Sequence, residues 1–171
     1  KSVARVLVVL GDRPAKTLET STRAELAKRL STFRHRVYTG PDVAAMLANA
    51  ATIRREHGSL GAAYRAHLDR HGHPTAALAD LADALRGAKP SRGLAHLVPD
   101  VRKGSASKRL WLYLRWMVRP ADGVDLGLWP VSARDLVIPV DTHVLRIGQN
   151  LGLTSRHDAS LKTAEEITAA L

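Results

Sequence analysis

Residues 136–153 read LVIPVDTHVLRIGQNLGL, and they carry the most informative pattern in the chain. A short apolar segment ends at Pro139, a carboxylate follows at Asp141, and apolar side chains then recur at helical spacing until Gly152 offers a stop. The pattern predicts that Asp141 is the N-cap of a helix, where free backbone N–H groups and the helix dipole favour its ionised form. A carboxylate held in this way can serve in catalysis, although capping alone is the commoner role of such an aspartate.

The chain is basic, with 26 lysines and arginines against 16 acidic residues in a length of 171, and its formal net charge is +10. Such an excess suits a polyanionic partner, because each phosphate that a protein neutralises releases counterions. The alternative is a composition bias from a GC-rich genome, since arginine far outnumbers lysine and alanine is abundant. Because basic residues also cluster around the motif described below, the sequence favours a nucleic-acid partner.

Composition also excludes several classes. The chain contains no cysteine, which rules out disulfides, thiol catalysis and a cysteine-ligated iron–sulfur cluster within it. The longest apolar run near the start, Val6–Leu10, is far too short for a signal peptide or a membrane span. With 45% hydrophobic residues the chain can bury one core, as one domain or as two small helical lobes. It starts at Lys1 without methionine and ends at Leu171 inside a helical pattern, so we expect a fragment that is truncated at both ends.

Apolar periodicity and capping residues predict helices along most of the chain. They are expected over residues 3–10 (where a strand is the alternative), from Thr22 to about Leu30, from Thr39 to before Gly58, from Ser59 through Leu68, from Pro74 to Gly87, and over residues 108–119. Asp141 and Thr163 are expected to start two more, the second through a capping-box spacing with Glu166. No strand pattern of period two appears. The chain is therefore expected to be an all-α domain of two helical layers around a cleft, 1–87 and 88–171, joined by a basic linker at residues 88–93.

Two clusters admit more than one interpretation. From Phe33 to Tyr38 aromatic rings alternate with cations, which suits stacking on bases and contact with phosphate, and equally suits a loop whose two rings enter the core. His67, His71 and His73 lie near the end of one predicted helix, where residues four apart share a face and could hold a metal. No acidic or cysteine ligand joins them at a telling spacing, and histidine is favourable at a helix C-terminus by itself. We therefore predict no metal site.

A row of cations marks the helix of residues 108–119. Lys108, Arg115 and Arg119 fall at positions i, i+7 and i+11 of a helix that is otherwise mostly apolar, so the helix is expected to be largely buried. Because an unpaired buried charge is expensive, the row must face a cleft or a charged partner. The alternative is that long side chains cover apolar surface and reach water with their heads. Arg119 near the helix end fits that alternative, whereas Lys108 in the first turn does not, because the dipole disfavours a cation there.

Parts of the sequence are similar to a known superfamily. Val140-Asp141-Thr142-His143-Val144, with Arg146 and the later Leu151–Leu153, resembles the catalytic-aspartate segment of the helix-hairpin-helix DNA glycosylases, the superfamily of endonuclease III and the 8-oxoguanine glycosylases. The stretches Lys103–Leu110 and Leu114–Arg119 are similar to a bacterial branch of that superfamily. The resemblance extends from about Phe33 to the end of the chain. It implies a helical base-excision fold.

The resemblance assigns roles to individual residues. Lys108 matches the lysine that attacks the sugar, and Asp141 matches the aspartate that assists it. The turn at residues 103–107 matches the hairpin whose backbone N–H groups lie against a DNA phosphate, as helix N-termini do for anions. Two features depart from endonuclease III. Its Leu-Pro-Gly-Val-Gly hairpin is matched here only in part, by Pro99 and Gly104. The insert Pro120–Pro130, which separates Lys108 from Asp141, is longer than in endonuclease III and is similar in length to that of the archaeal 8-oxoguanine glycosylases. The predicted DNA contacts are Lys103, Gly104, Ser105, Ser107, Arg109, Arg115, His143 and Arg146.

The resulting hypothesis is a DNA repair glycosylase with associated abasic-site lyase activity. A neutral Lys108, favoured by burial and by neighbouring cations, attacks the sugar C1′, releases the base and leaves a Schiff base, while Asp141 stabilises positive charge on the sugar. The target is a damaged nucleotide that leaves the stack of double-stranded DNA, and 8-oxoguanine is the leading candidate for its base. No cofactor, metal or membrane is expected. The protein is expected to be a cytoplasmic, nucleoid-associated monomer.

Two rival functions stay open. One is a non-catalytic DNA-binding module of the same fold, and the other is an RNA-binding protein, because a basic helical cleft with aromatic rings does not by itself distinguish the two sugars. The spacing of Asp122 and Asp125 indicates a turn, and we assign it no chemistry. Four aromatic side chains are candidates for lining a pocket, although a place in the core is the favoured alternative for each. They are Tyr38, Trp111, Trp116 and Trp129.

Overall fold

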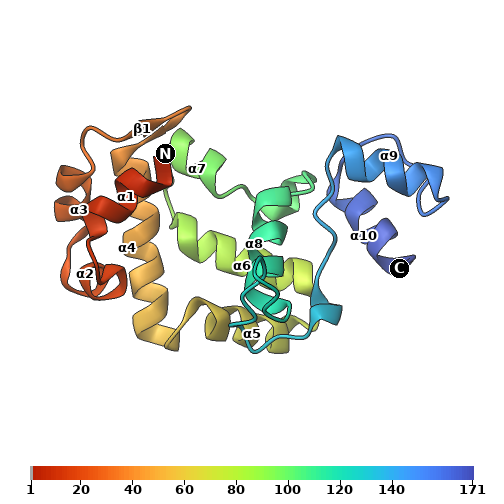
Figure 1. Ribbon diagram of the computed structural model, residues 1–171, viewed down its shortest axis with the longest axis horizontal. Helices are drawn as coiled ribbons and strands as arrows, with labels where there is room; N and C mark the ends of the chain where they lie inside the picture. Colours follow the sequence, from red (N-terminus) through yellow and green to blue (C-terminus); the bar gives the residue numbers. More distant parts are fainter. Residues whose placement is uncertain (1) are drawn as a thin grey trace. The chain divides into compact units, whose positions relative to one another are not determined.

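The computed structural model describes residues 2–171, and it is almost entirely helical (Figure 1). In that part of the chain, ten α-helices, two short 3-10 turns and one hairpin of two-residue strands follow one another. The predicted all-α class is confirmed. None of the helices between residues 2 and 171 is both long enough and apolar enough to cross a membrane.

The chain divides into two compact units, and each draws on two separate stretches of sequence. Unit 1 runs to Ala63 and resumes over Leu81–Pro99, while unit 2 comprises Tyr64–Asp80 and Asp100–Leu171. The two layers predicted from the sequence, 1–87 and 88–171, are each one continuous stretch and therefore differ from these units. The difference arises because α5 (Leu60–His71) and α6 (Pro74–Arg86) each run from one unit into the other.

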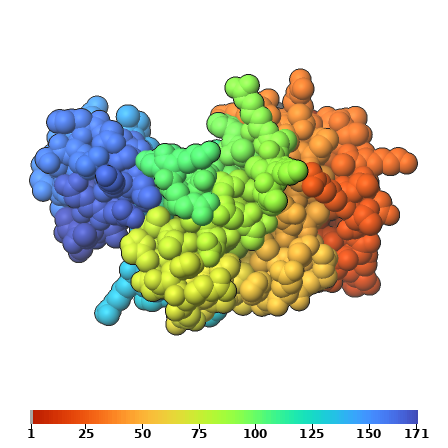
Figure 2. Space-filling model, turned by 180° about the vertical axis from the view of Figure 1, so that it is seen from behind, coloured from red at the N-terminus to blue at the C-terminus, as the bar shows by residue number. Residues whose placement is uncertain are grey.

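Unit 1 is a cluster of helices around α4 (Gly40–His57), which begins at the predicted Thr39-Gly40-Pro41-Asp42 start. In the space-filling view the red and orange segments of this unit form one continuous mass (Figure 2). The other helices that lie wholly in unit 1 are α1 (Ser2–Leu10), α2 (Pro14–Thr20), α3 (Arg23–Arg29) and α7 (Arg92–Leu97). Their shared core contains Leu10, Leu26, Leu30, Phe33, Val43 and Ala44.

The stretch from Phe33 to Tyr38 forms a hairpin, in which β1 (Arg34–His35) pairs antiparallel with β2 (Tyr38–Thr39). Phe33 and Tyr38 are each 8% exposed. The Tyr38 ring lies against His96 of α7, with 5.6 Å between the ring centroids. Both rings therefore pack in the core. Of the two interpretations of this stretch, the structure favours core packing over stacking on bases.

Two apolar helices are less buried than their composition predicts. In α1 only Leu10 is buried, and Val8 is 81% exposed. In α8 (Lys108–Val118) Trp111 is fully buried, yet Trp116 is 42% exposed. A helix packed on one side buries one stripe, whatever residues occupy the rest of its surface. The expectation that α8 is largely buried therefore holds only in part: Trp111, Leu114 and Val118 are buried, Arg109 and Trp116 are exposed, and the other residues of the helix are half-buried.

Unit 2 places α8 beside an extended segment, residues 136–140, that leads into α9 (Thr142–Asn150). The segment is held to α10 (Leu161–Ala169) because the Ile138 N–H donates to Thr168 Oγ1 at 2.9 Å. Between α9 and α10 the packing is close, since a Cβ added at Gly148 would lie 2.8 Å from Ile167 Cδ1. These contacts fix where Asp141 begins α9.

Capping residues behave as predicted at two helices and not at a third. Thr22 and Glu25 form the expected reciprocal box at α3, with the Thr22 N–H donating to Glu25 Oε2 at 2.7 Å. Asp141 caps α9. The predicted role of Thr163 is wrong, because α10 starts earlier and Ser160 is its N-cap. Serine and threonine offer the same acceptor, so spacing alone did not distinguish the two positions.

Candidate active site

The turn before α8 is held in shape by two left-handed residues. A 3-10 turn, η1 (Val101–Lys103), ends at Gly104 with φ of 81°, and Ser107, the residue before α8, has φ of 45°. The turn is tied to the start of α10, because the Leu161 N–H donates to the Gly104 carbonyl oxygen at 3.0 Å. A non-glycine residue with positive φ costs free energy and persists only where its surroundings hold it. The surroundings of Ser107 therefore hold the backbone in this conformation where α8 begins.

Three of the predicted turn contacts are exposed and one is not. Lys103, Gly104 and Ser105 face solvent. Ser107 is 4% exposed, its hydroxyl donates to the Ser105 carbonyl oxygen at 3.4 Å, and its N–H donates to Ser105 Oγ at 3.3 Å. Both polar groups of Ser107 are thus engaged inside the turn. The surface that the turn offers to a phosphate consists of residues 103–105, with exposed Arg109 as the second residue of α8.

Lys108 and Asp141 lie in direct contact. Lys108 opens α8, and its Nζ donates to Asp141 Oδ2 at 2.5 Å. The other carboxylate oxygen, Oδ1, accepts from the N–H groups of His143 and Val144, both at 2.9 Å. One oxygen of Asp141 therefore caps α9 and the other holds the lysine, so the carboxylate is fixed on both sides.

The environment of Asp141 keeps it ionised. The hydrogen bond from Lys108 and those from the Val144 and His143 N–H groups lower the pKa of this carboxyl from 3.8 to about 2, against a smaller opposing effect of burial. The two side chains remain accessible, with 42% of Lys108 and 29% of Asp141 exposed. A reactant can reach both groups. A permanently charged carboxylate suits the stabilisation of positive charge and is a poor proton acceptor.

The other predicted contacts lie on α9 and α8. His143 and Arg146 are exposed on α9, together with Ile147, which is 58% exposed. Arg115 is only 36% exposed and is occupied by an acidic partner, Asp125, with 3.5 Å between Nη2 and Oδ2. His143 and Arg146 can therefore meet an external polyanion directly, while Arg115 is already paired within the protein.

Asp125 is a buried carboxylate that the sequence analysis dismissed as part of a turn. Its side chain is fully buried, and Oδ2 lies 3.4 Å from Arg119 Nε as well as near Arg115. The insert folds back on the end of α8, because the Leu126 N–H donates to the Trp116 carbonyl oxygen at 2.6 Å and the Leu128 N–H to that of Met117 at 2.7 Å. The path of the insert places Asp125 against Arg115 and Arg119 of the row of cations. The predicted turn does form, since Asp122 Oδ1 accepts from the N–H groups of Val124 and Asp125.

The candidate aromatic residues fall mostly in the core. Trp111 is fully buried, and Trp129 is 8% exposed with its ring edge-on to Tyr113 at 5.4 Å. Tyr38 is in the core of unit 1. Trp116 is the exception, with 42% of its surface exposed on α8.

The histidines of α5 have an acidic partner that their spacing did not reveal. Asp80 of α6 lies 2.7 Å from His71 Nε2 and 3.6 Å from His67 Nδ1. The hydrogen bond from His71 lowers the pKa of Asp80, and burial acts in the opposite direction. No set of three or more histidine, cysteine, aspartate or glutamate side chains within residues 2–171 has a geometry that could hold a metal ion.

The chain belongs to the family described as "Protein of unknown function (DUF2400)", whose model matches residues 1–171. The match thus includes Lys108 and Asp141, the turn before α8 and the buried carboxylate of Asp125. No curated protein and no solved structure matches the chain.

Proposed function

We propose that this chain is a DNA glycosylase with associated abasic-site lyase activity, with Lys108 as nucleophile and Asp141 as its electrostatic partner. The observation that supports it is the 2.5 Å contact between Lys108 Nζ and Asp141 Oδ2, made at the starts of two helices and open to solvent. The pair also matches, residue for residue, the lysine and aspartate of the glycosylase motif.

The reaction balances with these two groups. Lys108 first loses a proton, and its amine then attacks C1′ of the extruded nucleotide. The bond from C1′ to the base breaks, and the base leaves with that electron pair and takes up a proton. The attached nitrogen loses a second proton, the C1′–O4′ bond breaks while O4′ takes up a proton, and C1′ is left joined to Lys108 as a Schiff base. Loss of a C2′ proton then expels the 3′ phosphate with the electron pair of the C3′–O bond. Asp141 stabilises the positive charge that develops on the sugar as the base departs.

The surroundings of the pair suit a duplex. The exposed turn at residues 103–105 precedes Lys108, and Arg109, His143 and Arg146 are exposed on the helices that carry the pair. Phosphate contacts of this kind position a protein on DNA without reading its sequence. The net charge of +10 adds a general attraction for a polyanion.

One observation favours a second candidate, a DNA-binding module without chemistry. Lys108 Nζ donates to the Asp141 carboxylate, and an amine engaged in this contact is not available to attack. A bound nucleotide must therefore displace or separate the pair before reaction. A module that binds duplex DNA in a salt-dependent manner without ever forming a covalent adduct would match this candidate.

Borohydride trapping tests the proposal. The protein is incubated with duplexes that contain 8-oxoguanine, uracil or an abasic site, and the Schiff base is reduced to a stable adduct. Wild-type protein is expected to form the adduct, and Lys108→Gln is expected to form none. Lys162→Gln, which removes an exposed lysine of α10, is the matched control and should trap like wild type.

The outcomes separate the candidates. An adduct with a base lesion identifies a bifunctional glycosylase and one of its substrates. An adduct with the abasic site alone supports the lysine chemistry and leaves the base to be found. Absence of any adduct from folded wild-type protein, or an adduct that survives Lys108→Gln, contradicts the proposal.

A further inference from the structure

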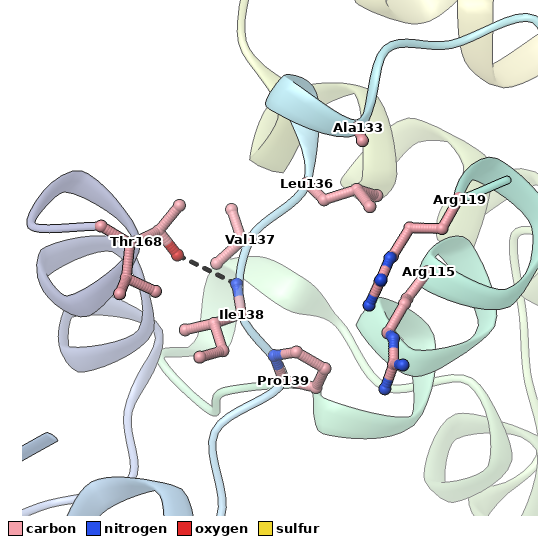
Figure 3. A pocket seen from close by; sticks show the side chains of 9 residues that line it. Arg115, Arg119, Ala133, Leu136, Val137, Ile138, Pro139 and Thr168 are labelled. Carbon is pink, nitrogen blue, oxygen red and sulfur yellow. Dashed lines mark hydrogen bonds between the residues drawn. The ribbon is translucent and has the colours of Figure 1, made fainter. Parts of the chain in front are cut away.

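Arg115 and Arg119, the last two cations of the row that starts at Lys108, line a pocket of about 470 Å³ in unit 2. Arg115 and Arg119 form one side, and the segment Leu136–Pro139 forms the other (Figure 3). Ala133, Thr168 and Leu171 complete the lining. The volume lies in the range that small-molecule sites occupy in proteins.

The cationic side of the pocket has donors to spare. Arg115 and Arg119 bring two positive charges against the single negative charge of Asp125, at 3.5 and 3.4 Å. The Arg115 Nε atom is buried without a hydrogen-bond acceptor among the described residues, and both carboxylate oxygens of Asp125 are likewise buried without a hydrogen-bond donor. Two guanidinium groups against one carboxylate leave a net positive charge on this side. The pocket therefore suits a ligand that supplies acceptors and no positive charge.

The opposite side of the pocket is apolar. Leu136, Val137, Ile138 and Pro139 line it, and the polar group nearest to them, Thr168 Oγ1, is already used by the Ile138 N–H. A bare phosphate would gain nothing from such a wall, because burying its charge there costs solvation. A flat ring with carbonyl oxygens on one edge satisfies both sides, since its faces pack on aliphatic side chains while its edge accepts from the guanidinium groups.

The pocket is in register with the catalytic pair. Arg115 follows Lys108 by seven residues, about 10 Å along the helix axis and on the same face. The Arg115 guanidinium lies at the same Asp125 oxygen that Arg119 contacts. On the other wall Pro139 stands two residues before Asp141. The pocket is therefore linked to the pair along both walls, by one face of α8 and by the segment that leads to Asp141.

We propose that this pocket receives the extruded base, and that Arg115 and Arg119 act as a charge filter for it. They accept bases whose edge presents carbonyl oxygens, as in oxidised guanine or uracil, and reject bases that carry a positive charge, as alkylated purines do. Arginine commonly donates to carbonyl and ring acceptors on a guanine edge. In 8-oxoguanine N7 carries a hydrogen, so the two acceptors on that edge are O6 and O8, one for each guanidinium group. This inference rests on the proposed function, since it concerns the base that Lys108 releases.

Single-turnover kinetics with matched substrates test the charge filter. Excision is measured on duplexes with 8-oxoguanine, uracil or cationic 7-methylguanine, and borohydride trapping is measured on an abasic duplex. Wild-type protein is expected to excise a carbonyl base at least about 10-fold faster than 7-methylguanine. Arg115→Met should lower excision of the carbonyl base about 10- to 100-fold, as loss of a charge-assisted hydrogen bond does. Trapping at the abasic site should fall by much less than excision does, because no base occupies the pocket there.

A folding check and two further variants accompany the test. Arg115→Met leaves Arg119 to pair with Asp125, and thermal unfolding verifies that the variant is folded. Arg115→Lys keeps the charge but loses the planar fork, so it should still reject 7-methylguanine while excising the carbonyl base more slowly than wild type. Arg134→Met removes an exposed arginine that does not line the pocket and should behave as wild type.

Three outcomes overturn the inference. One is equal excision of 7-methylguanine and the carbonyl bases by wild-type protein. Another is an Arg115→Met protein that loses abasic trapping as severely as excision, which would make Arg115 a general DNA contact. The third is trapping at the abasic site with no excision of either carbonyl base. Absence of both excision and trapping would instead overturn the proposed function, and the charge filter with it.

Discussion

Helix α8 carries an ion-paired site at each end of one face, and the two are built in opposite ways. At its start Lys108 and Asp141 are 2.5 Å apart and stay 42% and 29% exposed. At its end Asp125 is fully buried, and Arg115 and Arg119 share it at 3.5 and 3.4 Å. The carboxylate of the first site is held by backbone N–H groups of α9, and that of the second by the fold of the insert.

The difference teaches what each site can do. A charge held by backbone donors can remain at the surface, where a reactant reaches it, and its partner is free to leave. A charge held by burial depends on its partners, because no water replaces them. The first arrangement suits a group that takes part in a reaction. The second suits groups that must keep their positions while something else binds.

Removing both arginines should have the largest effect. Arg115→Met together with Arg119→Met leaves Asp125 buried without a cation, and we expect the free energy of unfolding to fall by about 3–5 kcal/mol. Urea unfolding at pH 7 measures it.

The single variants sharpen this result. Arg115→Met or Arg119→Met alone leaves one cation for one carboxylate, so each should cost well under half of the double variant. Additive losses from the two single variants would show that Asp125 does not depend on sharing them, contrary to the account of the buried site.

Neutralising Asp141 should have a smaller effect that depends on pH. Its pKa is lowered to about 2 from 3.8, so its charge contributes stability above about pH 4, and this contribution is lost as pH falls toward 2. Asp141→Asn keeps a good N-cap and loses the charge, and we expect Tm to drop by about 3 °C at pH 7. Thermal unfolding from pH 7 to pH 2.5 should show the two proteins converging below pH 4. A gap that stays constant across this range would mean that the Asp141 charge does not contribute.

Removing Lys108 should have the smallest effect on stability. Exposed ion pairs contribute little, because water solvates the partner that remains. We expect Lys108→Gln to change Tm by no more than about 2 °C, measured by thermal unfolding at pH 7. A loss as large as that of the double arginine variant would show that Lys108 is structural, and it would weaken the case for a reactive amine.

The same contrast explains what could be predicted from the sequence. Asp141 was predictable because an N-cap is a local feature: the carboxylate, the apolar spacing after it and the stop at Gly152 all lie within one short stretch. Its contact with Lys108 was not in the spacing, and only the resemblance to the glycosylases suggested it. The capping box of Thr22 is local in the same way, whereas at α10 two local candidates competed and Ser160 prevailed over Thr163.

Asp125 could not be predicted because burial is not a local property. Its neighbours indicate a turn, and the turn does form, but the position of the carboxylate depends on hydrogen bonds from the insert to carbonyl groups of α8. The pairing of Asp80 with His67 and His71 likewise depends on how α5 and α6 pack. The apolar composition of α1 and α8 overestimated how much of each helix is buried. A count of apolar residues does not show which face of a helix packs against the rest of the protein.

The most direct test of the central claim is to identify the residue that carries the covalent adduct. Wild-type protein is trapped with borohydride on an abasic duplex, the complex is digested, and mass spectrometry locates the sugar remnant. The account predicts that the remnant is on Lys108. A remnant on another lysine such as Lys103, or on the chain's terminal amine, with Lys108 unmodified, would contradict the assignment of Lys108 and Asp141 as the catalytic pair.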